Sequence, residues 1–111
     1  MNQIAYLLAD IGATNARFRS IDREGNELAS AELATGDYAT AEALVDDAAV
    51  KLGERFAAAL FAVAGPVLDG GAIEVTNAML HFEPDSCGER LGCGLTLVND
   101  FYAVARGIPI Y

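Results

Sequence analysis

The chain has 111 residues, of which 53% are hydrophobic and 21% are charged. This length suits one compact α/β domain with a core of its own, and the composition excludes intrinsic disorder. Sixteen acidic residues against seven basic ones give a formal net charge of -9, which repels phosphate backbones and anionic lipid headgroups. We therefore expect neither nucleic acid nor a membrane surface as a partner.

The sequence also indicates a reduced, cytoplasmic setting. Its two cysteines, Cys87 and Cys93, lack the His or Cys partners that a zinc site or a disulfide scaffold requires. No basic segment followed by a long apolar stretch begins the chain, and no apolar run approaches the ~20 residues of a spanning helix. We expect a soluble, untargeted chain.

The first half of the chain predicts an antiparallel meander and a helix. Ile4 to Ala9 is a short apolar run typical of a buried strand, and Ala13 to Asp22 alternates like a half-exposed strand. Turn residues follow, so Glu27 to Thr35 is expected to return as a third strand. A helix is expected between Thr40, a favoured N-cap, and Gly53, a favoured C-terminal cap. Its apolar face would carry Ala43, Leu44, Ala48 and Leu52.

The second half predicts two further buried strands with a hairpin and a short helix between them. Phe56 to Ala64 is almost wholly apolar, as is typical of a central strand covered on both faces and parallel to the first. Asp69 to Gly71 is expected to be a hairpin turn that leads into a strand from Ala72 to Thr76. Pro84 to Leu91 is expected to form a short helix, and Leu95 to Val98 the next strand.

A final helix is expected from Asp100 to Arg106, which gives the order βββ-α-β-(hairpin)-α-β-α. This order predicts an α/β fold with a five-stranded mixed sheet, an antiparallel three-strand meander at one side and helices on its faces. Such an order resembles that of the ribonuclease-H-like (actin-like ATPase) lobe. The apolar ending from Ile108 to Tyr111 suggests that the sequence is cut before a further element.

One polar constellation falls on the turn between the first two strands, which reads Asp-Ile-Gly-Ala-Thr-Asn. Gly12 and the small Ala13 let the backbone come close to an anion, and Asp10 can hold Mg²⁺ directly or through water. Thr14 and Asn15 add short polar side chains within reach of phosphate oxygens. An ordinary hairpin uses the same residue types, so this motif alone leaves both interpretations open.

A second constellation, Asn99-Asp100-Phe101, falls where a buried strand ends and a helix begins. In open α/β sheets ligands bind outside the carboxyl ends of the strands. A carboxylate at Asp100 can take a proton from a sugar hydroxyl as that hydroxyl attacks phosphorus, and Asn99 can fix the sugar by hydrogen bonds. For an isolated pair of this kind, helix capping is the more common role.

Three further features are ambiguous by themselves. Gly65-Pro66 ends a strand at the same edge, and Thr76-Asn77 would return near it; strand termination and a polar turn explain both. His81 has no metal-ligand spacing to any other residue, and we expect a solvated loop residue there.

In combination, however, these motifs resemble the bacterial glucokinase family. The match runs from Leu8 to Pro109 through Asp-x-Gly-x-Thr-Asn, Ala-Gly-Pro-Val, Thr-Asn and Leu-Val-Asn-Asp-Phe-x-Ala-Val-Ala. It implies that residues 1–111 are the N-terminal lobe of a two-lobed sugar kinase whose second lobe is absent from this chain. It also implies transfer of the ATP γ-phosphate to the 6-hydroxyl of glucose, in glycolysis, with ATP and Mg²⁺ as cofactors. The full-length protein would be cytoplasmic and could form a homodimer.

The resemblance also implies roles for individual residues. Asp100 would be the catalytic base and, together with Asn99, would bind glucose. The phosphate-binding loop would comprise Ala9, Asp10, Ile11, Gly12, Ala13, Thr14 and Asn15.

The chain departs from the family pattern at two positions. Ala13 stands where the family usually has a second glycine, and Leu80 stands where a tryptophan commonly follows Thr-Asn. In the family the second lobe supplies further sugar ligands and the adenosine pocket, so residues 1–111 alone are expected to show no turnover. The alternatives are a noncatalytic sugar- or nucleotide-binding domain or regulator built on the same lobe, and an actin-like ATPase that acts on protein conformation.

Overall fold

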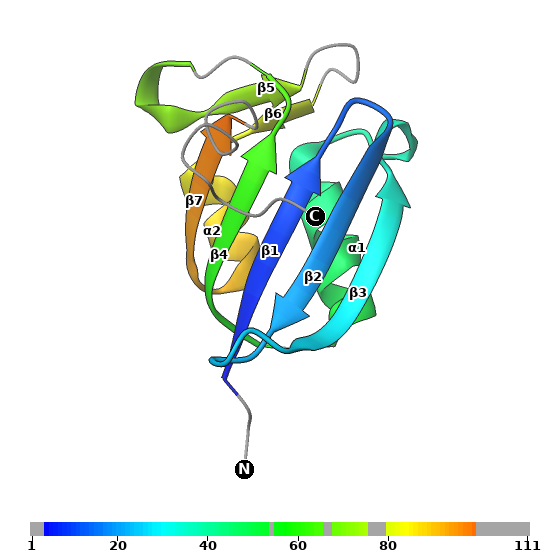
Figure 1. Cartoon of the computed structure of the whole chain (residues 1–111). Coiled ribbons are helices and arrows are strands. Elements are labelled where there is room, and N and C mark those ends of the chain that lie inside the picture. Colours follow the sequence, from blue (N-terminus) through cyan, green and yellow to red (C-terminus); the bar gives the residue numbers. More distant parts are fainter. Residues whose placement is uncertain (1–3, 54, 66–67, 76–79, 100–111) are drawn as a thin grey trace.

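The computed structural model describes residues 4–53, 55–65, 68–75 and 80–99. In Figure 1 a twisted five-stranded sheet stands in front of two helices, with a small hairpin at the upper end of the sheet. The sheet has the order β3-β2-β1-β4-β7. Its strands are β1 (Ala5–Ile11), β2 (Asn15–Ile21), β3 (Glu27–Ala34), β4 (Phe56–Val63) and β7 (Gly94–Asn99). The first three pair antiparallel and β1, β4 and β7 are parallel, which confirms the predicted mixed sheet and meander.

Both predicted helices with described residues are present, as α1 (Ala41–Leu52) and α2 (Pro84–Leu91). The Thr40 hydroxyl accepts a hydrogen bond from the Ala43 N–H at 3.1 Å, and Gly53 ends α1 in the left-handed conformation at φ 69°. The predicted apolar face of α1 was wrong at Ala43, which is exposed. Positions two apart in a helix lie on opposite sides, and the buried positions are Ala41, Leu44, Val45, Ala48 and Leu52.

A second, two-stranded sheet departs from the expectation. It pairs β5 (Ile73–Val75) with β6 (Leu80–Phe82), and the segment containing His81 had been expected to be a loop. Three residues are too few for a periodic pattern, although Leu80 and Phe82 are buried and His81 between them is exposed. The expected turn is present as the 3-10 turn η2 (Asp69–Gly71), in which Gly70 and Gly71 have φ of 80° and 84°. It is closed by the Leu68 N–H, which donates to the Ala72 carbonyl at 2.7 Å. A second 3-10 turn, η1 (Thr35–Asp37), follows β3.

The core lies between the sheet and the two helices. Three aromatic rings stack edge to face at its centre, with ring centroids 5.7 Å apart for Phe18 and Phe61 and 6.4 Å apart for Phe61 and Phe82. Along β1 every second residue from Ala5 to Ile11 is buried on this side.

The other face of the sheet is more open than the apolar sequence of β4 had indicated. Helices α1 and α2 pack against each other and lie on one side of the sheet, so within the described residues no helix covers the opposite side. Ala57 and Ala58 of β4 are exposed and Leu60 is half-buried. The expectation that this strand is covered on both faces is therefore not met within the described part of the chain.

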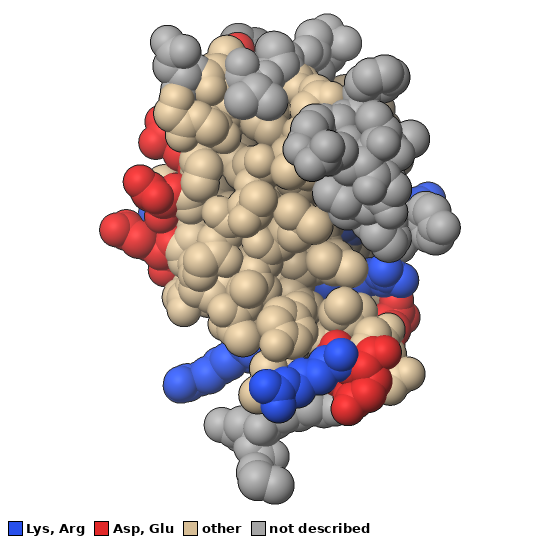
Figure 2. Space-filling view, turned by 60° about the vertical axis from the view of Figure 1, so that its left-hand side comes forward, with Lys and Arg blue, Asp and Glu red and all other residues tan. Residues whose placement is uncertain are grey.

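Strand β7 forms one edge of the sheet and carries no charged residue. Figure 2, which brings the β7 side of the molecule forward, shows a broad surface without charged side chains, with acidic side chains at its left margin and both acidic and basic side chains below it. An uncharged edge strand lacks the charged side chains that commonly prevent strands of other chains from pairing with it.

Two further expectations concern the cysteines and the last helix. Cys87 and Cys93 are free thiols, and burial raises the pKa of Cys87 to about 11, so this thiol stays protonated at neutral pH.

The helix expected from Asp100 to Arg106 lies outside the described residues. None of the helices that the structure does describe has the length and apolar character needed to cross a bilayer.

We predict that Phe61→Ala lowers the free energy of unfolding by about 3–5 kcal/mol, because it removes the ring that contacts both Phe18 and Phe82. Urea unfolding followed by circular dichroism measures this. Val50→Ala is the control, since Val50 is 79% exposed and its truncation should change stability by less than about 0.5 kcal/mol. Equal effects of the two substitutions would show that the aromatic cluster is not the centre of the core.

Candidate functional site

The candidate site lies at the carboxyl edge of the three parallel strands. Register pairs Ile11 at the end of β1 with Val63 of β4, and Val63 with Asn99 of β7. The Asp10 to Asn15 turn and Asn99 therefore lie at one edge of the sheet with a single strand between them. This is the edge at which open α/β sheets bind ligands.

The turn after β1 is a short, closed hairpin. The Gly12 N–H donates to the Asn15 carbonyl at 2.9 Å, and the Ala64 N–H donates to the Ile11 carbonyl at 2.9 Å, which ties the turn to the end of β4. The side chains of Ala9 and Ile11 are buried in the core, so neither side chain reaches the site. The three residues at the tip of the turn, Ala13, Thr14 and Asn15, are exposed.

Thr35 bonds to this turn from the core side, a role that no sequence pattern indicates. Its hydroxyl donates to the Gly12 carbonyl at 2.8 Å and its N–H donates to the Thr14 carbonyl at 2.9 Å. Thr35 is completely buried at the start of η1, and 23 residues separate it from Gly12. A single threonine at a strand end has no periodicity or spacing that would indicate such a contact.

Asp10 and Asn99 lie on opposite faces of the sheet. Asp10 belongs to the row with Ala62 and Val98, on the face that α1 and α2 leave open, whereas Asn99 belongs to the next row, on the helix face. The antiparallel partner of Asp10 is Arg17, which forms an ion pair of 2.8 Å with Glu32 of β3.

The described residues contain no group of three His, Cys, Asp or Glu side chains that could hold a metal ion by themselves. Mg²⁺ at nucleotide sites is commonly held by one or two carboxylates together with the phosphates of the substrate. A single carboxylate beside the turn, Asp10, fits that mode of binding and does not fit an all-protein metal site.

Asn99 and Gly65 bring two of the sequence motifs together. The Asn99 side-chain amide donates to the Gly65 carbonyl at 2.5 Å, just past the end of β4. Gly65 is also closely approached by β5, because a Cβ at this position would lie 1.9 Å from the Glu74 carbonyl oxygen. Position 65 therefore requires glycine, because any side chain there would collide with β5. The lack of a side chain lets the hairpin of β5 and β6 pack directly on the end of β4.

Several predicted site residues lie outside the described part of the chain: Pro66, Thr76, Asn77, Asp100 and Phe101. Of the two departures from the family pattern, Ala13 is exposed at the tip of the turn, and Leu80 is 1% exposed in the core.

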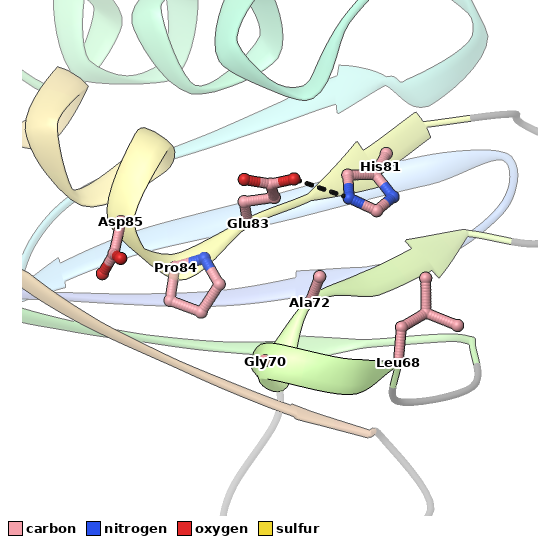
Figure 3. Close-up of a pocket in the computed structure, with 7 residues that line it drawn as sticks. All are labelled: Leu68, Gly70, Ala72, His81, Glu83, Pro84 and Asp85. Carbon is pink, nitrogen blue, oxygen red and sulfur yellow. Dashed lines mark hydrogen bonds and ion pairs between the residues drawn. The ribbon is translucent and has the colours of Figure 1, made fainter.

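A hollow of about 640 Å³ lies elsewhere, between η2, β6 and the start of α2 (Figure 3). His81 points into this region and its Nε2 atom lies 3.0 Å from a carboxylate oxygen of Glu83. Glu83 and Asp85 make the lining acidic, which is unfavourable for phosphate. The hollow contains none of the predicted site residues, and His81 is exposed, as expected, but lies in a strand.

A family model and curated relatives both match this chain to glucokinases. The family model described as Glucokinase matches residues 7–111. A glucokinase of Psychromonas ingrahamii is 34% identical over 112 residues, which cover 99% of this chain and 34% of that protein. The chain thus spans about a third of the length of the curated relatives it matches.

Solved structures agree with this match. The crystal structure of a glucokinase from an Antarctic psychrotroph has a TM-score of 0.78 at 26% identity, over 96% of this chain and 35% of that one. A ROK family glucokinase from Streptomyces griseus, solved in complex with glucose and AMPPNP, has a TM-score of 0.67 at 29% identity, over 93% of this chain and 35% of that one.

We predict that Gly65→Ala destabilises the chain by at least the roughly 1–3 kcal/mol typical of overpacking, because the added methyl group meets a backbone carbonyl that cannot rotate away. Gly36→Ala is the matched control, since a Cβ at Gly36 has no atom within 4 Å. Thermal unfolding of both variants measures the difference. Gly65→Ala that is as stable as Gly36→Ala would mean that β5 does not pack on the end of β4.

Proposed function

The chain belongs to the glucokinase family, and we propose from this premise that it is the N-terminal lobe of a two-lobed, ATP-dependent hexose kinase. The proposed reaction transfers the γ-phosphate of ATP to the 6-hydroxyl of glucose, in glycolysis, in a cytoplasmic and homodimeric enzyme. The relatives that the chain matches are about three times as long, and we propose that a second lobe supplies the adenosine pocket and further sugar ligands.

One observation carries this proposal: the turn after β1 and Asn99 at the end of β7 lie at one edge of the sheet, joined through the end of β4. Phosphoryl transfer needs positioning and charge neutralisation more than covalent chemistry. A backbone turn and a polar side chain at the same edge of the sheet are suited to positioning two substrates next to each other. A relative from Streptomyces griseus was solved in complex with glucose and AMPPNP, which is consistent with a sugar and a nucleotide as the two proposed ligands.

In the proposed mechanism the turn from Ala9 to Asn15 binds the phosphates through backbone N–H groups, since the net charge of -9 gives this chain little positive charge to offer. Asp10 would hold Mg²⁺, directly or through water, and an ion held there would supply positive charge to neutralise the phosphates. Asn99 fixes the sugar by hydrogen bonds.

Asp100 is the proposed catalytic base. It accepts the proton of the sugar 6-hydroxyl while the hydroxyl oxygen bonds to the γ-phosphorus and the bond from that phosphorus to the β-phosphate oxygen breaks, which releases ADP. Its place directly after β7, at the start of the helix expected from the sequence, favours the ionised carboxylate that this role needs.

A noncatalytic sugar- or nucleotide-binding domain on the same lobe is the second candidate. It predicts ligand binding without turnover, and it gives Asp100 only a capping role. The two candidates therefore differ in the effect of a substitution at Asp100.

We predict that Asp100→Asn, in a two-lobed protein that contains this chain, lowers kcat by about 10²–10⁴-fold while the fold is retained, because the amide cannot accept the proton. A coupled assay for glucose 6-phosphate measures the rate, and the 111-residue chain alone, expected to show no turnover, serves as a blank. Asp85→Asn, which changes an exposed carboxylate at the start of α2, is the matched control and should leave kcat unchanged. Near-normal turnover in Asp100→Asn would favour the capping role.

A further inference from the structure

The buried contact between Thr35 and the turn after β1 supports a function beyond packing. Thr35 is polar and completely buried, and its hydroxyl and its N–H bond to the Gly12 and Thr14 carbonyls respectively. We propose that Thr35 is a positioning residue for phosphate binding, whose hydroxyl sets the direction of the Ala13 N–H group. This inference rests on the proposed function of the turn as a phosphate loop.

The direction of the Ala13 N–H group follows from the geometry of one peptide group. A trans peptide carries its C=O and N–H on opposite sides, and the described chain contains no cis peptide. Because the Gly12 carbonyl points at the buried Thr35 hydroxyl, the N–H of the same peptide, at Ala13, points toward the exposed side of the turn. No acceptor for this N–H occurs among the described residues, and it is a donor available to an anion.

Thr35 is itself held in place through the next segment of the chain. Three residues further on, the Tyr38 hydroxyl donates to the Asp47 carboxylate on α1. This hydrogen bond raises the pKa of Tyr38 to about 12 and holds the pKa of Asp47 below its usual value. The phenol therefore stays protonated and the carboxylate stays ionised across neutral pH, so the segment that positions Thr35 remains anchored to α1.

Removal of the Thr35 hydroxyl alone would leave the peptide group between Gly12 and Ala13 free to rotate. Valine has the shape of threonine without the donor, and in Thr35→Val the Gly12 carbonyl must find another donor or rotate toward water. The Ala13 N–H turns with it, because both groups belong to one plane. We expect phosphate affinity to fall about three- to tenfold, the effect of one hydrogen bond of ordinary strength. Thr35→Ser keeps the hydroxyl and should restore the affinity.

The test is a titration of the ¹⁵N-labelled 111-residue chain with Mg-ATP to millimolar concentration, followed through the amide shifts of Ala13 and Asn15. Three variants are compared with the natural sequence: Thr35→Val, Thr35→Ser and Ser20→Ala. Ser20→Ala is the matched control, because Ser20 is also completely buried and its hydroxyl also bonds a backbone carbonyl, that of Ala29, away from the turn. If Thr35→Val does not fold, as its amide spectrum would show, Thr35→Ala replaces it.

The expected result is weaker Mg-ATP binding in Thr35→Val only, with the other two variants within about twofold of the natural chain, since a twofold change in Kd corresponds to about 0.4 kcal/mol. Unchanged binding in Thr35→Val, or equal weakening in Ser20→Ala, would overturn the positioning role, because either result reduces Thr35 to a contributor to stability. If Mg-ATP shifts no amide of the turn even in the natural chain, the phosphate-loop function itself fails and this inference fails with it.

Discussion

Parallel strands in register end together, and the site depends on this constraint more than on any single side chain. The pairing of β1 with β4 and of β4 with β7 places Ile11, Val63 and Asn99 in one row, so the groups that follow each strand meet at one edge. The aromatic cluster of Phe18, Phe61 and Phe82 stabilises this arrangement from the helix side. A one-residue slip of β7 would move Asn99 to the other face of the sheet.

Around this edge, backbone groups make most of the contacts that hold the turn. The Ile11 carbonyl accepts from the Ala64 N–H, and the Gly12 N–H donates to the Asn15 carbonyl. Thr35 donates to the carbonyls of Gly12 and Thr14. Gly65 has no side chain, which allows β5 to approach the end of β4. A phosphate-binding turn built in this way needs no lysine or arginine, which is consistent with an acidic chain. If the turn binds phosphate as proposed, the Ala13 N–H group is directed before any ligand arrives, so little ordering remains for the ligand to impose.

Local signals in the sequence were sufficient for most of the fold. Alternation predicted β2, the Thr40 and Gly53 caps predicted both ends of α1, and Pro84 marked the start of α2. Strand β6 was missed because it has only three residues, and the open face of β4 was missed because an apolar run does not reveal which neighbours cover it. The site motifs were visible as residue types, but the role of Thr35 was not, since it depends on a contact across 23 residues of sequence.

The proposed function requires this lobe to present the phosphate-binding and sugar-binding groups of a hexose kinase at one edge of its sheet. The most direct measurement is a crystal structure of a two-lobed protein that contains this chain, solved with glucose and AMPPNP. We expect a phosphate oxygen within about 3 Å of the Ala13 nitrogen and a glucose hydroxyl hydrogen-bonded to Asn99. Both ligands bound elsewhere, with no contact to the turn or to the end of β7, would contradict it.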